Sequence, residues 1–197
     1  DLKKSRMPLV LFDRVIEELD CDKVDIDDHD AAFMATQRLI DHQRKKIAFV
    51  STIGNLNVGK LREQGYREAI SKVPNNQKNG ELIFEFKEDA QLQSNIAKLL
   101  KDHPEVDGIV AADNVSGIIA INVARSLGYE VPKDLSVIGF SDSSKSQLST
   151  PKLAYINQHA AKIGERSVQL LLKRLNGETD AFVHEKIAVD LECHESL

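Results

Sequence analysis

The sequence predicts an α/β protein built on a parallel β-sheet. Two short apolar runs, residues 109–112 and 135–140, have the length and composition of buried strands. Between them, residues 119–127 carry apolar side chains at helical spacing, and Gly128 follows as a common helix stop. A strand, a helix and a strand in this order predict a right-handed βαβ unit in which the two strands are parallel.

The first predicted strand comprises residues 8–12 (PLVLF) and ends at Asp13 and Arg14. These two residues could also form a local ion pair at a turn, which would contribute little stability. Residues 15–30 follow as a polar, acidic segment for which no strand is predicted. Its aspartates lack the central Gly and the closing Glu of an EF-hand loop, so no calcium site is predicted there.

An amphipathic helix is predicted next, because residues 31–40 carry apolar side chains at helical spacing. Asp28 or Asp30 is expected to cap its N-terminus, where negative charge is favourable. Residues 47–50 (IAFV) form the next strand. The polar loop 55–59 after it lacks the spacing of a phosphate-binding P-loop.

A second helix is predicted over residues 61–70, which places Arg62 in its first turn. The helix dipole disfavours a cation at that end. A planar donor group there would suit the hydroxyls or the carboxylate of a ligand, and a solvated surface arginine is the alternative. A strand at residues 82–86 and a helix at residues 90–100 lead to the central βαβ unit.

The C-terminal part continues the alternation of strands and helices. A polar loop at residues 143–151 precedes a short strand at residues 153–158. Residues 163–175 form a long amphipathic helix that ends before Gly177. Residues 182–191 alternate in the manner of a closing strand or pair of strands.

The composition is that of an ordinary globular protein: 197 residues, 42% hydrophobic and 29% charged, with a net charge of −5. No long stripe of Lys and Arg is present, so the chain is not expected to hold DNA or a membrane surface by itself. Cys21 and Cys193 lie near opposite ends and suggest no disulfide framework, which favours a reducing cytoplasm. No apolar run reaches the length of a membrane span, and no signal peptide is seen.

The common catalytic and metal-binding motifs are absent, including G-x-S-x-G, H-E-x-x-H, C-x-x-C and G-x-G-x-x-G. The six histidines are dispersed along the chain. Cys193 and His194 are adjacent, and neighbours on a strand point to opposite faces, so they make a poor metal pair. We therefore predict no enzyme activity, no cofactor and no metal site.

Polar residues follow both strands of the central unit. Asp113 and Asn114 come after the first strand, and Ser141 and Asp142 come after the second. Open α/β sheets bind ligands outside the carboxyl ends of their strands, so these residues predict a site for a polar small molecule. In the alternative interpretation, Asn114 or Ser116 caps a helix while Ser141 and Asp142 form a turn. The repetition at two consecutive strands favours the site.

Several motifs point to one family. The most specific are VPKDLSVIGF at residues 131–140 and the pattern Arg62-x-x-Gly65-Tyr66-Arg67. Weaker matches lie at residues 47–50, 106–113, 164, 170–172 and 176–177. Together they resemble the effector-binding core of the lactose-repressor (LacI/GalR) family of bacterial transcription regulators, over nearly the whole chain.

The resemblance implies a periplasmic-binding-protein-like fold. Such a fold has two parallel-sheet lobes with helices on both faces and a ligand cleft between the lobes. Residues 29–158 with 181–197 would form the complete C-terminal lobe. Residues 1–28 with 159–180 would form a partial, apparently truncated N-terminal lobe. The DNA-binding headpiece of the family is absent from this chain.

The resemblance also implies which residues bind the effector: Asp13, Arg62, Asp113, Ser141 and Asp142. Arg62 is similar to the arginine with which the family grips its effector, and Asp13 to a contact from the truncated lobe. Ser141 stands where the family usually has Asp, which removes one carboxylate acceptor and puts a standard clamp on sugar hydroxyls in doubt.

Two further departures from the family pattern lie outside that set. Asn114 replaces a usual Asp. Gln43 replaces a usual helix-ending Gly, at a cost of about 1 kcal/mol if its backbone is left-handed.

The function implied is that of the sensor domain of a LacI-type DNA-binding transcriptional regulator. It would bind a sugar or sugar derivative and control DNA affinity allosterically, as a cytoplasmic homodimer that contacts DNA only through the missing headpiece and does not contact a membrane. The apolar face of residues 118–123 could pack internally or across the dimer interface. Alternatives are a periplasmic-type sugar-binding protein for transport and an α/β enzyme with Asp113 or Asp142 as base, for which no second catalytic group is visible.

Overall fold

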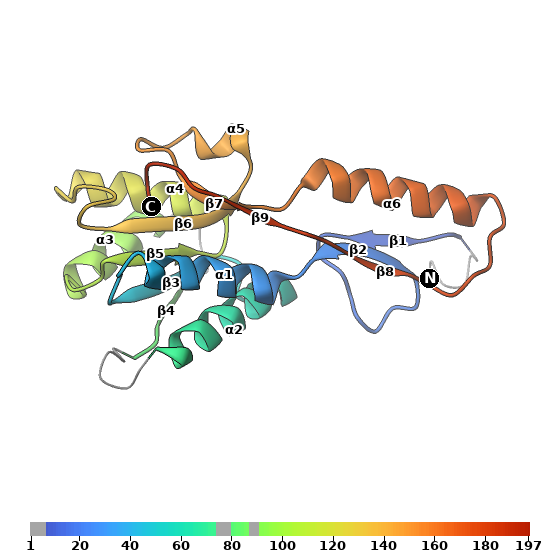
Figure 1. Ribbon diagram of the computed structural model, residues 1–197, viewed down its shortest axis with the longest axis horizontal. Helices are drawn as coiled ribbons and strands as arrows, with labels where there is room; N and C mark the ends of the chain where they lie inside the picture. The colour runs from blue at the N-terminus through green and yellow to red at the C-terminus, as the bar shows by residue number, and fades with distance from the viewer. Residues whose placement is uncertain (1–6, 74–79, 87–90) are drawn as a thin grey trace. The chain divides into compact units, whose positions relative to one another are not determined.

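The computed structural model describes residues 7–73, 80–86 and 91–197, and the chain divides into two compact units. Unit 1 comprises Asp1–Asp27 and Gln158–Val189, and unit 2 comprises Asp28–Asn157 and Asp190–Leu197. Each unit has its own β-sheet (Figure 1).

Unit 2 contains a six-stranded sheet with the order β4-β3-β5-β6-β7-β9. All neighbouring strands are parallel except β9, which pairs antiparallel with β7. The strands are β3 (Ile47–Ser51), β4 (Leu82–Glu85), β5 (Gly108–Ala111), β6 (Ser136–Ser141), β7 (Ala154–Asn157) and β9 (Asp190–Glu192). The central βαβ unit is confirmed in that β5 and β6 are parallel neighbours joined by a helix.

Helices cover both faces of this sheet (Figure 1). They are α1 (Asp28–Asp41), α2 (Asn57–Lys72), α3 (Leu92–Asp102), α4 (Asn114–Ser126) and the short α5 (Ser143–Ser146). Ala48, Val50 and Ile109 belong to the core shared with α3 and α4. The intervening Phe49 instead lies against Tyr66 of α2, with ring centroids 5.4 Å apart. The predicted α/β class with helices on both sides of a parallel sheet is therefore confirmed.

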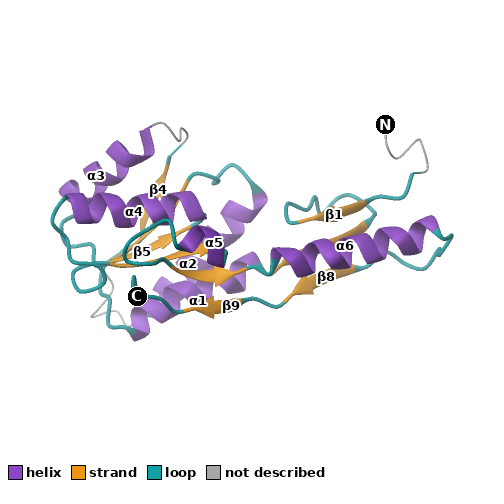
Figure 2. Cartoon of the chain, turned by 90° about the horizontal axis from the view of Figure 1, so that it is seen from above, coloured by secondary structure: helices purple, strands orange, loops and turns teal. Residues whose placement is uncertain are grey.

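Unit 1 contains a three-stranded parallel sheet with the order β1-β2-β8. Its strands are β1 (Val10–Phe12), β2 (Asp22–Ile26) and β8 (His184–Ile187). Helix α6 (Ala160–Leu175) packs along β1 and β2, with Ile163 and Leu170 on its buried side (Figure 2).

Strand β2 corrects the prediction that residues 15–30 contain no strand. All five of its residues are buried, although Asp22, Lys23 and Asp25 are charged. Charges inside a protein require partners because desolvation disfavours them. Asp22 accepts two hydrogen bonds from the guanidinium of Arg174, with N–O distances of 2.6 and 2.8 Å.

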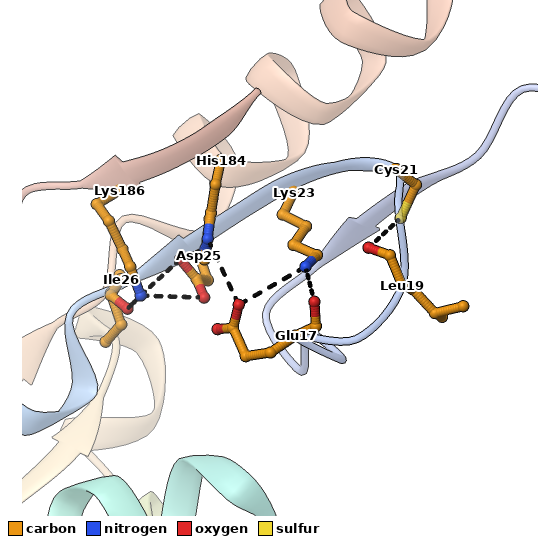
Figure 3. A network of polar contacts seen from close by, with 8 residues as sticks. All are labelled: Glu17, Leu19, Cys21, Lys23, Asp25, Ile26, His184 and Lys186. Atoms are coloured by element: carbon orange, nitrogen blue, oxygen red, sulfur yellow. Dashed lines mark hydrogen bonds and ion pairs between the residues drawn. The ribbon is translucent and has the colours of Figure 1, made fainter. Parts of the chain in front are cut away.

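The charged side chains on the opposite face of β2 also have partners of opposite charge (Figure 3). Asp25 lies 3.0 Å from Nε2 of His184 and 3.2 Å from Nζ of Lys186. The ammonium group of Lys23 donates to the carbonyl oxygen of Glu17 at 2.7 Å and lies 3.6 Å from its carboxylate. The hydrophobic pattern missed β2 because its burial depends on ion pairs with residues distant in sequence.

Other element boundaries also differ from the predictions. Helix α2 begins at Asn57, so Arg62 lies in its second turn, and the electrostatic argument from a first-turn cation was wrong. The predicted loop 143–151 contains α5. Residues 182–191 form two strands that belong to different sheets. The predicted start of the third helix at Ala90 lies outside the described residues, and α3 begins at Leu92.

Three helices end with a residue in the left-handed conformation. Gly128 after α4 and Gly177 after α6 have φ of 91° and 90°, and Gln43 after α1 has φ of 62°. The N–H of Gln43 donates to Ile40 O, and the N–H of Arg44 donates to Leu39 O, as in a Schellman motif. Gln43 therefore occupies a left-handed position that favours glycine, which is the condition under which the departure from the family pattern was expected to cost about 1 kcal/mol.

Gln43→Gly should stabilise the folded protein by about 0.5–1 kcal/mol, because glycine relieves the left-handed strain but loses more backbone entropy on folding. Urea unfolding followed by circular dichroism would measure the change. Gln43→Ala is the control, since it removes an exposed side chain and keeps the strain. A glycine variant no more stable than the alanine variant would contradict the prediction.

The Asp22–Arg174 pair predicts a pH dependence of stability. The hydrogen bond from Arg174 holds the pKa of Asp22 below its ordinary value of 3.8. A carboxyl group with a lowered folded-state pKa stabilises the protein above its ordinary pKa and loses this effect as the pH falls through the folded value. Asp22→Asn should therefore cost about 2 kcal/mol at neutral pH and flatten the loss of stability in acid.

Urea unfolding of the two proteins from neutral pH into the acid range would measure this difference. Asp41→Asn is a matched control on the exposed end of α1. Parallel stability–pH curves for the parent and Asp22→Asn would contradict the assignment.

Candidate functional site

The candidate site lies at the carboxyl edge of the sheet of unit 2. Strands β3, β5 and β6 are parallel, so their carboxyl ends meet at the same edge. Thr52 follows β3, Asp113 follows β5, and Ser141 ends β6 with Asp142 directly after it. The residues predicted from unit 2 are thus gathered at one edge, where open α/β sheets bind their ligands.

Arg62 of α2 reaches this edge from the helix layer. Its Nη1 donates to the carbonyl oxygen of Ala112 at 2.6 Å, directly after β5. Its guanidinium carbon lies 3.7 Å from the centre of the Phe140 ring in β6, a cation–π contact. Only 5% of Arg62 is exposed, so the solvated surface arginine considered above is excluded.

Asp28 is the partner of Arg62 that sequence reasoning missed. Its Oδ1 accepts from Nε of Arg62 at 2.7 Å and lies 2.6 Å from Nη2, and the residue is 3% exposed. The sequence suggested only a helix cap for Asp28, because it lies in an acidic run before α1. The two residues are 34 positions apart, and nothing in the local pattern connects them.

Asp113 joins two elements at the edge. Its Oδ1 accepts the N–H of Ser116 at 2.8 Å and so caps α4. Its Oδ2 accepts the hydroxyl of Thr52 at 2.9 Å. The alternative interpretation in which Asn114 or Ser116 is the cap was wrong, because the cap is Asp113, two residues after the last residue of β5.

Asp142 caps α5 in a similar way. Its Oδ1 accepts the backbone N–H groups of Ser144 and Lys145 at 2.9 and 3.0 Å and the hydroxyl of Ser144 at 2.5 Å. The Ser144 hydroxyl and these N–H groups hold the pKa of Asp142 below its ordinary value, so the group is ionised at neutral pH. Ser141 is buried, and its hydroxyl donates to Asp142 O at 3.3 Å.

Asp13 belongs to unit 1 and directly follows β1. Its backbone is left-handed with φ of 60°, and its N–H donates to Val24 O at 3.1 Å. The Asp13–Arg14 ion pair considered from the sequence forms at 3.9 Å between exposed side chains. Asp13 therefore occupies a carboxyl strand end in unit 1, as Asp113, Ser141 and Asp142 do in unit 2.

Unit 1 also contains a group of possible metal ligands. Ligand atoms of Glu17, Asp25 and His184 lie within 4.8 Å of one another. Both carboxylates already face ammonium groups, those of Lys23 and Lys186 (Figure 3). A divalent cation would have to displace these lysines, so the group fits an ion-pair network better than a metal site.

Comparison with known proteins identifies the family. Residues 36–196 match the family model of the periplasmic binding protein-like domain. The chain belongs to this family. The predicted resemblance to the effector-binding core of LacI/GalR regulators is also confirmed by the matched relatives. One is the HTH-type transcriptional regulator CelR of Thermobifida fusca, which is 33% identical over 174 residues, or 87% of this chain and 49% of that protein.

Solved structures agree with this assignment. The transcriptional regulator CelR in complex with cellobiose has a TM-score of 0.84 and 30% identity, covering 99% of this chain and 60% of that one. The transcription regulator CcpA of Lactococcus lactis has a TM-score of 0.87 and 26% identity, covering 99% of this chain and 71% of that one. The chain spans about half the length of the curated relatives it matches. Among the helices of residues 7–73, 80–86 and 91–197, none is long and apolar enough to cross a membrane.

Arg62→Met should lower the free energy of unfolding by about 3 kcal/mol, because it leaves the buried Asp28 carboxylate without its guanidinium. The double variant Arg62→Met/Asp28→Asn should recover part of this loss, since the buried charge is removed as well. Urea unfolding of the parent, both single variants and the double variant would measure the coupling. Additive losses in the double variant would show that the two side chains do not depend on each other.

Proposed function

We propose that this chain is the sensor domain of a LacI-type transcriptional regulator and binds a carbohydrate at the carboxyl edge of unit 2. The observation that carries the proposal is the convergence of Arg62, Asp113, Ser141 and Asp142 on this one edge. Carboxylate and hydroxyl oxygens accept hydrogen bonds from sugar hydroxyls. Asp13 is proposed as the contribution of unit 1.

The matched proteins support regulation over transport. The relatives named above are transcriptional regulators, and the CelR structure was determined in complex with cellobiose. We therefore favour the regulator over a transport protein and propose that the chain catalyses no reaction. The sequence motifs point the same way, because none of them combines a nucleophile with a base.

In the proposed mechanism, the effector acts through a shift between conformations. A ligand changes such an equilibrium only by its differential affinity for the two states, and the coupling is reciprocal. Effector binding by this domain would alter the DNA affinity of a headpiece in the whole cytoplasmic protein, and DNA would alter effector affinity equally. We propose a homodimer, in which two such headpieces are linked.

Asp113→Asn tests the role of the edge in sugar binding. The amide keeps an oxygen for the N–H of Ser116 but loses the negative charge, so affinity for the bound sugar should fall about 10- to 100-fold. Isothermal calorimetry with cellobiose, ribose and other mono- and disaccharides would measure it.

Asp107→Asn is the matched control. Asp107 precedes β5 at its amino end, where its carboxylate accepts the N–H groups of Lys45 and Lys46 at 2.8–2.9 Å. The same substitution beside the amino end of the same strand, at the opposite edge of the sheet, should leave sugar affinity unchanged. Equal affinities for the parent and Asp113→Asn would remove Asp113 from the site, and an equal loss in both variants would point to a general structural effect.

A further inference from the structure

We infer that the effector is an uncharged polyol, and that Asp28 excludes anionic sugars by neutralising Arg62. The inference rests on the proposed function, because it names the ligand class of the same edge. It depends on the charge balance around one buried guanidinium.

All three nitrogens of the Arg62 guanidinium already have acceptors within the protein. Nε and Nη2 contact Asp28 Oδ1 at 2.7 and 2.6 Å, and Nη1 donates to Ala112 O at 2.6 Å. Arginine binds phosphate or carboxylate groups best through two parallel N–H donors. Here a carboxylate of the protein already occupies the Nε and Nη2 side, and the Phe140 ring covers the face of the group.

The remaining charges at the edge are also unfavourable for an anion. Asp113 and Asp142 present carboxylates at the ends of β5 and β6. Lys145 follows β6, but its Nζ lies 3.9 Å from Asp142 Oδ2. A phosphate or carboxylate on the ligand would lose its hydration and meet groups of like charge.

A neutral polyol suits the same groups. Each sugar hydroxyl can donate to a carboxylate oxygen and accept from another donor. Asp28 does not have to touch the ligand for this selection, because it acts by cancelling the charge of Arg62. We therefore describe Asp28 as a specificity-determining residue that acts through Arg62.

The experiment compares neutral sugars with their charged counterparts by calorimetry: glucose with glucose 6-phosphate, ribose with ribose 5-phosphate, and cellobiose with cellobionate. The parent should bind the preferred neutral member at least about 100-fold more tightly than its anion. Asp28→Asn restores a net positive charge at Arg62, and the amide oxygen can still accept from Nε. It should reduce this preference at least about tenfold, mainly through tighter binding of the anion.

Asp107→Asn is the matched control, since it removes a carboxylate at the opposite edge of the sheet and should keep the preference of the parent. Circular dichroism would establish folding, and the preference of the parent still tests the inference if Asp28→Asn does not fold. Equal affinity of the parent for a sugar and its anion, or an unchanged preference in Asp28→Asn, would overturn this inference alone. No binding of any sugar by the parent would overturn the proposed function together with it.

Discussion

The buried contact between Arg62 and Asp28 determines the geometry of the candidate site. It joins the first residue of α1 to the second turn of α2, and the same guanidinium reaches the ends of β5 and β6. An arginine that is only 5% exposed is tolerated because a carboxylate and a carbonyl oxygen accept hydrogen bonds from its guanidinium. Asp113 comes directly after Ala112, and Ser141 directly after Phe140. Asp113 and Ser141, the two candidate ligand contacts, are therefore each next in sequence to a residue that the Arg62 guanidinium contacts.

The carboxylates at this edge also maintain the helices that follow the strands. Asp113 caps α4 and Asp142 caps α5, so each stabilises a helix N-terminus and presents charge at the edge. A helix cap and a ligand contact are therefore compatible roles for each of these carboxylates. In a parallel α/β unit, the residue that ends a strand also precedes a helix, and one carboxylate can serve both roles.

The fold was predictable to the extent that its elements bury apolar side chains. The central βαβ unit followed from two apolar runs and a helical repeat, and Gly128 marked the helix end correctly. Strand β2 was not predicted, because its burial rests on contacts such as Asp22–Arg174, which are 152 residues apart. Asp28 was missed for the same reason. Periodicity reports local patterns and carries no information about which distant charges will pair.

Buried charge alone does not distinguish a binding site from a structural ion pair in this protein. Asp22 of unit 1 is as well buried as Asp28, and each is paired with an arginine. The two pairs differ in their position relative to the strands. Asp22 begins β2, and Asp107 likewise precedes β5 and holds the N–H groups of Lys45 and Lys46. The Asp28–Arg62 pair instead contacts the carboxyl ends of β5 and β6, at the edge where open α/β sheets bind ligands. Asp22 and Asp107 lie at the amino ends of strands, so we interpret them as structural. Asp28 contacts the carboxyl edge through Arg62, and for this reason we propose a role in specificity for it.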